Sequence, residues 1–394
     1  MKPKIYFTCS ISERARDPAL RDFFQVSGRI IQEYGELADP HVLRDDVLEY
    51  EAQQAKLGVN VHNRDEMLWR PCKITVADVS GATTGGGAEI AEMLMAGKQV
   101  LVVYHNSKRG SPYVVQWQHP NLTVQSYGTV EELERIERSF IESKLKRSSL
   151  PGKLVVLEGP DGSGKGTQAK RLVTRAAQEG LVMKTMSFPT YDHPSATDVK
   201  MYLNGEFGGL EEVGSYRGSV PFCWNRFFFA KQMKQDLQQG VHYALDRFLS
   251  SNVGHQGGKI ADPLEHMRFI DWLFDFEHRM FGIPVPDLTV FLRVPPVIGQ
   301  QLVERKAKEQ RQYLTEGRTK DIHEASLDHL LRTEEAYLHA ANTQPDWVIV
   351  ECLRQGISEA DIANPDLPIE QKLRSIDDIH EEVYRIVQPL FTKA

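Results

Sequence analysis

The 394-residue chain has few cysteines, no long apolar run and no secretory-signal pattern, each of which would indicate a class of protein. It has four cysteines, far apart and without a CxxC pair or Cys/His cluster, which argues against disulfide staples and zinc sites and is typical of a cytosolic protein. No run approaches the roughly 20 apolar residues of a membrane span. The start, MKPKIYFTCSISERARD, lacks the pattern of a secretory signal. We therefore expect a cytoplasmic protein with no membrane partner.

Positive charge is also scarce, because the formal net charge is −7. A general nucleic-acid-binding protein is basic, so we expect no nucleic-acid polymer as a partner. The chain shows no internal repeat and no low-complexity tract. Its composition is that of a globular protein, with 41% hydrophobic and 26% charged residues, and its length suggests two or three domains.

Strand-like and helix-like segments alternate along the chain in two series. The polar stretch ESKLKRSSLPGK interrupts the pattern between them. We predict two tandem parallel-sheet α/β domains, residues 1–145 and 153–394, joined by a linker at 146–152. The expected strands are KIYFTCS, KITVADV, QVLVVYH and LTVQSY in the first series, and LVVLE, YALDR, LTVFLRV and WVIVE in the second.

A glycine-rich loop with a lysine follows the first strand of the second series. In GPDGSGKGT, four residues separate Gly159 from Gly164, and Lys165 comes next. Glycines let backbone N–H groups face nucleotide phosphates, and the lysine reaches the β and γ oxygens. The alternative, a plain turn between strand and helix, does not require a lysine in this register. We predict an ATP site formed by Gly159, Asp161, Gly162, Ser163, Gly164, Lys165, Gly166 and Thr167.

The residue after the lysine departs from the usual phosphate-loop pattern. Gly166 stands where a serine or threonine hydroxyl normally holds Mg²⁺, and Thr167 follows it. We therefore expect ATP and water to hold most of the Mg²⁺ coordination, with Thr167 or Asp246 as the candidate protein ligand.

Four further blocks make this half resemble the thymidylate kinase family. The resemblance covers nearly all of 153–394 and implies a P-loop nucleoside monophosphate kinase fold that transfers the ATP γ-phosphoryl group to dTMP. Its blocks are FPTYDHPSATDVKMYLNGEFG at 188–208, PFCWNRF at 221–227, DRFLSSNVGHQGGK at 246–259 and GRTKDIHEASLDHLLRTEEAY at 317–337.

The resemblance implies a role for each matching residue. Phe222 would stack on thymine, and Arg226, one helical turn later, would donate to a base carbonyl. Asp246 would lie at the carboxyl edge of the sheet, where α/β ligands bind, and Arg247 would grip the acceptor phosphate. The other implied dTMP contacts are Asp161, Phe188, Ser251, Asn252, His255 and Gln256.

A lid arginine, Arg311 or Arg318, would close over the transferring group, because Gly162 stands where some relatives carry a catalytic arginine. Two other positions differ from the family pattern. Thr190 replaces an arginine that contacts the acceptor phosphate, and His255 replaces an aromatic residue that excludes a ribose 2′-hydroxyl. A kinase acting on another nucleoside monophosphate stays an alternative.

In the first half, the stretch VADVSGATTGGGAEIAEMLMAG is the one we expect to carry chemistry. A strand ends at Asp78-Val79, three glycines predict a close backbone turn, and Glu89 is expected in the first turn of a helix. A structural role is available for this glutamate, because an acidic residue there complements the helix dipole by about 0.3–1 kcal/mol.

The surroundings of Glu89 resemble the nucleoside 2-deoxyribosyltransferase family, which has a flavodoxin/Rossmann-like fold, and within it the 2′-deoxynucleoside 5′-phosphate N-hydrolases. The matching pieces are IYFTCSI, DPHV, HNRDEML and ADVSGATTGGGAE. Deoxyribose lacks the electron-withdrawing 2′-hydroxyl, so its C1′–N bond can break through an oxocarbenium-like state that a carboxylate stabilises or traps.

The second resemblance implies that Glu89 is the nucleophile and Asp65 the second carboxyl, which protonates the leaving base or activates water. Tyr6, expected at the end of the first strand, would orient Glu89. The implied 5′-phosphate contacts are Thr83, Thr84 and the Gly85–Gly87 amides, with His41 nearby. The hydrolases complete their pocket with a serine from a neighbouring subunit; Ser111 is the counterpart here, and a homodimer is expected.

The phosphate-binding run of those hydrolases is not present, because CSISERAR has Ser12 in its arginine position and Glu13 beside it. Three interpretations stay open: a 5′-phosphate hydrolase, a transferase or hydrolase of unphosphorylated nucleosides, and an inactive descendant. We therefore expect a bifunctional enzyme that uses dTMP and other 2′-deoxynucleoside monophosphates. The alternative is a monofunctional kinase with a binding or dimerisation module.

Overall fold

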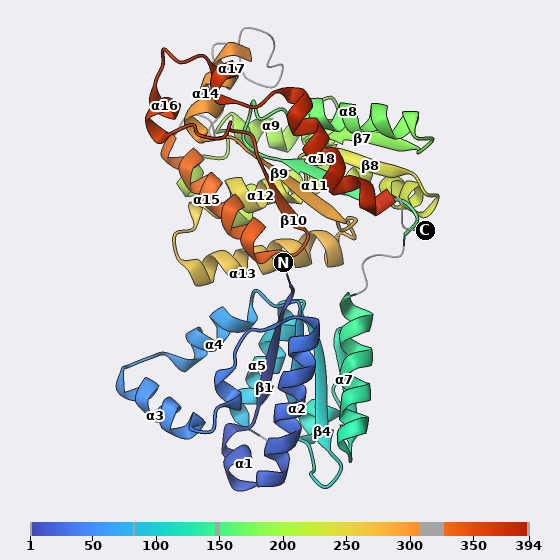
Figure 1. Cartoon of the computed structure of the whole chain (residues 1–394), viewed down its shortest axis with the longest axis vertical. Helices are drawn as coiled ribbons and strands as arrows, with labels where there is room; N and C mark the ends of the chain where they lie inside the picture. The colour runs from blue at the N-terminus through green and yellow to red at the C-terminus, as the bar shows by residue number, and fades with distance from the viewer. Residues whose placement is uncertain (1, 82, 146–149, 307–326, 392–394) are drawn as a thin grey trace. The chain divides into compact units, whose positions relative to one another are not determined.

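A computed structural model describes residues 2–81, 83–145, 150–306 and 327–391 (Figure 1). The chain divides into two compact units, Met1–Arg147 and Ser148–Ala394, and the boundary lies inside the stretch predicted as a linker. Each unit is described by itself below. Within the described residues, no helix has both the length and the apolar character needed to cross a membrane.

The first unit is an α/β layer structure built on one parallel sheet. Its elements are β1 (Lys4–Cys9), α1 (Ile11–Arg16), α2 (Pro18–Tyr34), β2 (Glu36–Leu37), η1 (His41–Leu43), α3 (Val47–Lys56), α4 (Val61–Trp69), β3 (Ile74–Asp78), α5 (Thr84–Met95), β4 (Gln99–His105), α6 (Pro112–Val115), β5 (Leu122–Tyr127) and α7 (Val130–Leu145). Over the described residues, the strand order is β2-β1-β3-β4-β5. This is the flavodoxin-like order, in which ligands bind at the carboxyl edge between β1 and β3.

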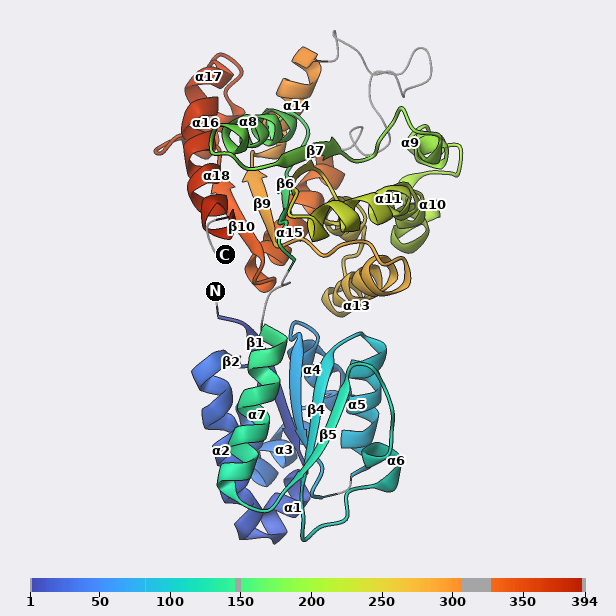
Figure 2. The same ribbon diagram turned by 90° about the vertical axis from the view of Figure 1, so that its right-hand side faces the viewer.

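The two faces of this sheet bury different side chains of β1. Helices α2 and α7 cover one face of the sheet, and α4 and α5 cover the other (Figure 2). Ile5 and Phe7 pack into the core on the side of α2 and α7, whereas Tyr6 packs into the core on the side of α4 and α5. Because side chains alternate along a strand, Thr8 lies on the same face as Tyr6. Both therefore face the helix that carries Glu89.

Two sequence-based expectations about this region are wrong. The three glycines do not form a loop; α5 already begins at Thr84, because the Thr83 hydroxyl caps it by accepting from the Gly86 amide at 3.0 Å. Glu89 consequently lies in the second turn of α5, where the dipole explanation is weaker, since that effect is confined to the first turn. Tyr6 is also not at the end of β1 but its third residue.

The second unit is also an α/β layer structure with a parallel sheet. Its elements are β6 (Leu154–Glu158), α8 (Lys165–Gln178), β7 (Met183–Ser187), η2 (Pro194–Ala196), α9 (Thr197–Leu203), α10 (Leu210–Val213), α11 (Ser215–Gln238), β8 (His242–Asp246), α12 (Leu249–His255), η3 (Gly257–Lys259), α13 (Pro263–Phe274), η4 (Asp275–Met280), β9 (Leu288–Arg293), α14 (Pro296–Lys306), α15 (Leu327–Thr343), β10 (Trp347–Glu351), α16 (Glu359–Ala363), α17 (Ile369–Lys372) and α18 (Ile376–Phe391).

The strand order of this sheet is β10-β9-β6-β8-β7, as far as the described residues show. Helices α8 and α18 cover one face, while α11, α12, α13 and α15 cover the other (Figure 2). The central strand β6 ends directly before the glycine-rich loop. Since parallel strands end at one edge, this loop meets the residues that follow β8 and β9 there.

Candidate active sites

The glycine-rich loop of the second unit has a backbone that other residues rarely adopt. Gly159, Gly162 and Gly164 have φ angles of 147°, 85° and 89°, in the region that favours glycine. Lys165 begins α8, and its buried ammonium donates to the carbonyls of Gly159 at 2.9 Å and Pro160 at 2.8 Å. The loop therefore combines a helix N-terminus with a lysine whose charge lies inside the turn, which suits a polyphosphate.

Asp246 takes the space beside Gly166. A Cβ on Gly166 would lie 2.8 Å from Asp246 Oδ2, so a serine or threonine there would push the carboxylate aside. The next residue, Thr167, is exposed on the first turn of α8. Because Mg²⁺ prefers oxygen ligands, Asp246 fits the task of the missing hydroxyl.

Arg247 is held between the loop and the sheet. Its φ of 66° is the one positive value among the described residues other than glycine, and its guanidinium donates to Asp161 Oδ1 at 2.6 Å. Partial burial alone would raise the pKa of Asp161, but the charges of Arg247 and Lys165 hold that pKa well below its ordinary value. Strained backbone of this kind is typical of functional sites.

The predicted base-binding residues lie one turn apart on α11. Phe222 is half-buried and meets the Tyr202 ring edge-on at 5.8 Å between centroids. Arg226 is buried and pairs with Glu277: its Nε lies 2.8 Å from Oε2, and an Nη atom contacts Oε1. A third donor bonds the Phe248 carbonyl at 3.2 Å. A fourth N–H contacts the Cys223 sulfur at 3.8 Å. Arginine has five N–H donors, so one is left for a ligand.

The other predicted dTMP contacts surround this pair in the same unit. Asn252 donates to the Ser219 carbonyl at 3.2 Å, Gln256 donates to the Tyr202 hydroxyl at 3.1 Å, and Ser251 donates to Glu158 at 2.8 Å. Phe188 is buried in the core beneath them. The lid arginines, Arg311 and Arg318, lie outside the described residues.

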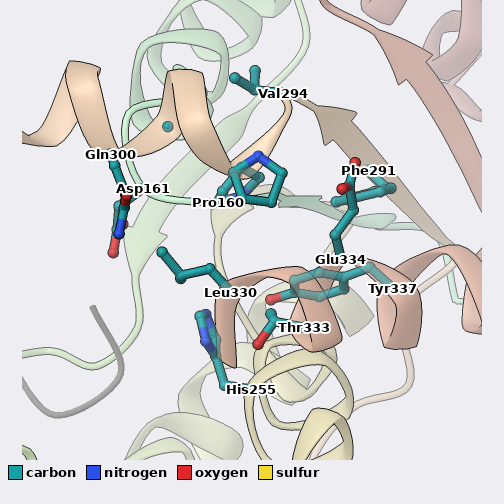
Figure 3. A pocket seen from close by; sticks show the side chains of 12 residues that line it. Pro160, Asp161, His255, Phe291, Val294, Gln300, Leu330, Thr333, Glu334 and Tyr337 are labelled. Carbon is teal, nitrogen blue, oxygen red and sulfur yellow. The ribbon is translucent and has the colours of Figure 1, made fainter. Parts of the chain in front are cut away.

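A cavity adjoins the loop on the side of His255 (Figure 3). Asp161 and His255 line one end of it, and Val294, Leu330 and Tyr337 contribute to its apolar wall. Burial, together with the charge of Arg247, lowers the pKa of His255 well below its ordinary value, so this ring is neutral. The cavity lies between the phosphate loop and α15, whose first residues belong to the family-like block at 317–337.

The sequence profile of the thymidylate kinase family matches residues 157–361, just over half of the chain. The chain belongs to the thymidylate kinase family. Among similar curated proteins, the thymidylate kinase of Danio rerio is 31% identical over 148 residues, 38% of this chain and 64% of that protein. The thymidylate kinase of Mycobacterium tuberculosis is 28% identical over 220 residues, 55% of this chain and 99% of that protein.

The human thymidylate kinase is 30% identical over 143 residues, which cover 36% of this chain and 61% of that protein. The chain thus spans less than two thirds of the length of the zebrafish and human enzymes that it matches. A solved thymidylate kinase structure from Candida albicans aligns at 21% identity over 62% of this chain and 94% of its own, with a TM-score of 0.42.

In the first unit, Glu89 accepts two hydrogen bonds from β1. The Thr8 hydroxyl donates to Oε2 at 2.8 Å, and the Tyr6 hydroxyl donates to Oε1 at 3.3 Å. Burial raises the pKa of Glu89 to about 7, against the lowering effect of the Thr8 bond. Sequence reasoning missed Thr8, although its two-residue spacing from Tyr6 was a usable signal.

Asp65 belongs to a charged network next to Glu89. Burial raises the pKa of Asp65, while the bond from Arg64 Nε at 2.7 Å opposes that rise. Arg64 also contacts Glu51, and His41 has a carboxylate at each ring nitrogen: Asp39 at Nδ1, and Glu51 at Nε2 at 2.9 Å. Asp39, His41 and Asp65 lie close enough to hold a metal ion, but the bonds of Arg64 and His41 already use these carboxylates.

A pocket lies at the N-terminal end of α5. Thr8, Thr83, Thr84, Gly87 and Ser111 line it, which brings together most of the residues predicted to hold a phosphate. His41 and Gly85 are not among its lining residues. His41 was expected here, and its ring nitrogens are instead used by Asp39 and Glu51 on the Asp65 side.

In the segment after β1, the negative charge of Glu13 is paired with a lysine. Ser10 caps the short helix α1 by accepting from the Glu13 amide at 3.2 Å. The Glu13 carboxylate pairs with Lys108 at 2.9 Å, and Lys108 also contacts Asp17 at 3.0 Å. Because Lys108 offsets the negative charge of Glu13, the Glu13 carboxylate would repel a phosphate dianion less strongly than an unpaired one.

Proposed function

We propose that the second unit transfers the γ-phosphoryl group of ATP to dTMP, giving dTDP and ADP. The observation that carries the proposal is Lys165, held inside a glycine loop beside Asp246 and Arg247 at the carboxyl edge of the sheet. Membership of the thymidylate kinase family and the names of its relatives support dTMP as the acceptor.

Phosphoryl transfer depends mainly on positioning and charge neutralisation. In this proposal, the loop amides and Lys165 bind the ATP phosphates, and Arg247 binds the acceptor phosphate. Asp246 would hold Mg²⁺, which would supply positive charge that offsets the charge of the phosphates. Phe222 stacks on the base and Arg226 donates to it, with Glu277 fixing the orientation of Arg226.

The test is ADP formation by the full chain with dTMP. Lys165→Ala should abolish it, because the β and γ oxygens lose their cation; Lys170→Ala, an exposed lysine of the same helix, should not. An acceptor panel tests the base. A tenfold or greater preference for dUMP, UMP or AMP over dTMP would show that the chain is a kinase of another nucleoside monophosphate.

We further propose that the first unit cleaves the N-glycosidic bond of 2′-deoxynucleoside 5′-monophosphates. The supporting observation is Glu89, a carboxylate that two β1 hydroxyls orient; one of them, the Thr8 hydroxyl, belongs to a residue that lines the pocket at the start of α5. Because burial raises the pKa of Glu89 to about 7, about half of this side chain is the reactive carboxylate at neutral pH, and the fraction grows as the pH rises.

In this reaction, the Glu89 carboxylate attacks C1′ as the C1′–N bond breaks, and Asp65 gives its proton to the leaving base. Water, deprotonated by Asp65, then hydrolyses the glycosyl ester, which restores Glu89 and releases deoxyribose 5-phosphate. Thr83, Thr84 and the glycine amides of α5 hold the 5′-phosphate.

Product analysis with each deoxynucleotide tests the second activity. Glu89→Gln should stop base release and leave ADP formation unchanged; Glu92→Gln, on the same helix but bonded to His62, should retain both. Base release from nucleosides alone would favour a nucleoside enzyme. If no nucleoside or nucleotide releases its base, the first unit would be a binding or dimerisation module.

We also propose a homodimer, although Ser111, which was expected to reach the pocket of a neighbouring copy, lines the pocket of its own chain. Analytical ultracentrifugation of the full chain tests it, and a single monomeric species at micromolar concentration would contradict it.

A further inference from the structure

Glu158, the last residue of β6, is a buried carboxylate that the proposed chemistry does not use. Its side chain is fully enclosed, yet its oxygens accept from several donors. Oε2 accepts from the hydroxyls of Ser250 at 2.7 Å and Ser251 at 2.8 Å. Oε1 accepts from the Gly159 amide at 3.0 Å. A buried charge is stable only when its bonds are satisfied, so this carboxylate is fixed in place.

Two more donors connect Glu158 to elements on opposite sides of it. Tyr337, in the middle of α15, donates its hydroxyl to Oε1 at 3.1 Å, and Arg247 places Nη1 3.4 Å from the same oxygen. Tyr337 is almost fully buried, and its ring stacks on Phe291 at 4.9 Å between centroids. Glu158 thus joins α15 to the arginine that meets the acceptor phosphate.

On the side of α12, the packing against Tyr337 is tight. A Cβ on Gly254 of α12 would lie 2.3 Å from the tyrosine ring, so α12 can approach the ring only with glycine at this position. Ser250 and Ser251 belong to the same helix. Helix α12 therefore supplies both the serine donors to Glu158 and the surface that holds Tyr337.

Arg247 needs such support, because its backbone is strained and the carboxylate at its Nη2, Asp161, belongs to the glycine-rich loop. Its Nη1 lies 3.4 Å from Glu158 Oε1 at the end of a central strand, 3.4 Å from Ser251 Oγ and 3.3 Å from His255 Nε2. A carboxylate fixed on a strand holds an arginine more rigidly than one on a loop, and the remaining N–H groups then keep a constant direction.

We propose that Glu158 and Tyr337 are positioning residues that hold Arg247 ready for the phosphate of the acceptor nucleotide. The pair acts through Arg247 and touches neither the base nor ATP. This inference rests on the proposed kinase function, and it adds a direct link between α15 and the acceptor-phosphate site.

The test compares two ligands that differ only in the phosphate. Binding of dTMP and of thymidine to the full chain is measured by calorimetry, without ATP, for wild type and Tyr337→Phe. Because Arg247 contacts only the phosphate, dTMP affinity should fall about tenfold, the effect of losing a hydrogen bond to a charged group. Thymidine affinity should stay within about twofold of wild type.

Tyr243→Phe is the matched control, because it removes another buried tyrosine hydroxyl of this unit, which bonds Asp236 at 2.5 Å away from Arg247. It should change neither affinity. In an Arg247→Gln background, Tyr337→Phe should have no further effect on dTMP binding. Glu158→Gln, where it folds, should repeat the Tyr337→Phe result.

Equal losses for dTMP and thymidine, or unchanged dTMP affinity in Tyr337→Phe, would overturn the inference and leave the kinase proposal intact. A wild-type chain that binds thymidine and dTMP equally well would also overturn it. Absence of any dTMP binding by wild type would instead refute the kinase proposal itself, and the inference with it.

Discussion

Glu137 of α7 offers a stability test that does not depend on either activity. It lies fully buried between α7 and α2, where the Ser27 hydroxyl donates to its Oε1 at 2.5 Å. Its Oε2 has no hydrogen-bond partner among the described residues. Burial, reinforced by the charge of Asp78, raises the pKa of Glu137 to about 8 from an ordinary value of 4.5.

This shift makes the stability of the first unit depend on pH. The unfolded chain gives up the proton near pH 4.5, whereas the folded chain keeps it to about pH 8. Protonated Glu137 therefore makes its full contribution to the stability of the fold below about pH 4.5. This contribution is lost as the pH rises through the folded-state pKa of about 8. Between about pH 5.5 and about pH 8.5, the loss is about 3 kcal/mol.

Glu137→Gln removes the titration and keeps an acceptor for Ser27. The difference in free energy of unfolding, variant minus wild type, should therefore rise by about 3 kcal/mol across that pH range. Hydrogen exchange on the full chain measures it at each pH, because peptides of the first unit report the change and those of the second serve as an internal standard.

Asp22→Asn, at an exposed position of α2, is the control and should give a flat difference. If the Glu137→Gln difference also stays flat within about 0.5 kcal/mol, the carboxylate is not held protonated in the fold and the reasoning from burial is wrong.

Three further predictions concern the two sites. Base release should rise about tenfold from pH 6 to pH 8 as Glu89 ionises. Thr8→Val should move the midpoint of the rate–pH curve upward from about 7, because the Thr8 hydroxyl stabilises the Glu89 anion. A wild-type midpoint below about 5 would contradict this. Gly166→Ser should lower kinase kcat by about tenfold or more in steady-state assays, because the serine side chain displaces Asp246. An unchanged kcat would mean that the position of Asp246 does not affect phosphoryl transfer. Glu277→Gln should destabilise the second unit by about 3–5 kcal/mol in urea unfolding, because Arg226 keeps its buried charge without a partner; a loss under about 1 kcal/mol would argue against that account.

Regular features with a local cause could be predicted from the sequence. The eight predicted strands and the glycine-rich loop depend on periodicity and on residues close in the chain, and the structure confirms them, whereas the edge strands β2 and β7 were not predicted. Asp246 was also expected at the end of its strand, and β8 ends there.

Features that depend on pairing across the fold could not be predicted. Glu158 and Glu277 find their partners through long-range packing, so no local pattern indicates them. The start of α5 was misplaced because glycines favour loops in isolation, whereas the Thr83 cap makes them helical here. His41 was misplaced because Glu51, its partner at Nε2, comes from another element, α3; Asp39, its partner at Nδ1, is two residues away and was a usable signal.

The order of the strands along the chain also has a consequence during synthesis. Every strand of the first sheet lies before residue 148, so that unit can fold on the ribosome while the rest is still being translated. The second sheet can be completed only later, because its middle strand β6 is synthesised first and its edge strand β10 ends at Glu351. At about 5–20 residues per second, the nascent phosphate loop stays without its neighbouring strands for several seconds or longer, and chaperones would meet the two halves of this polypeptide at different times.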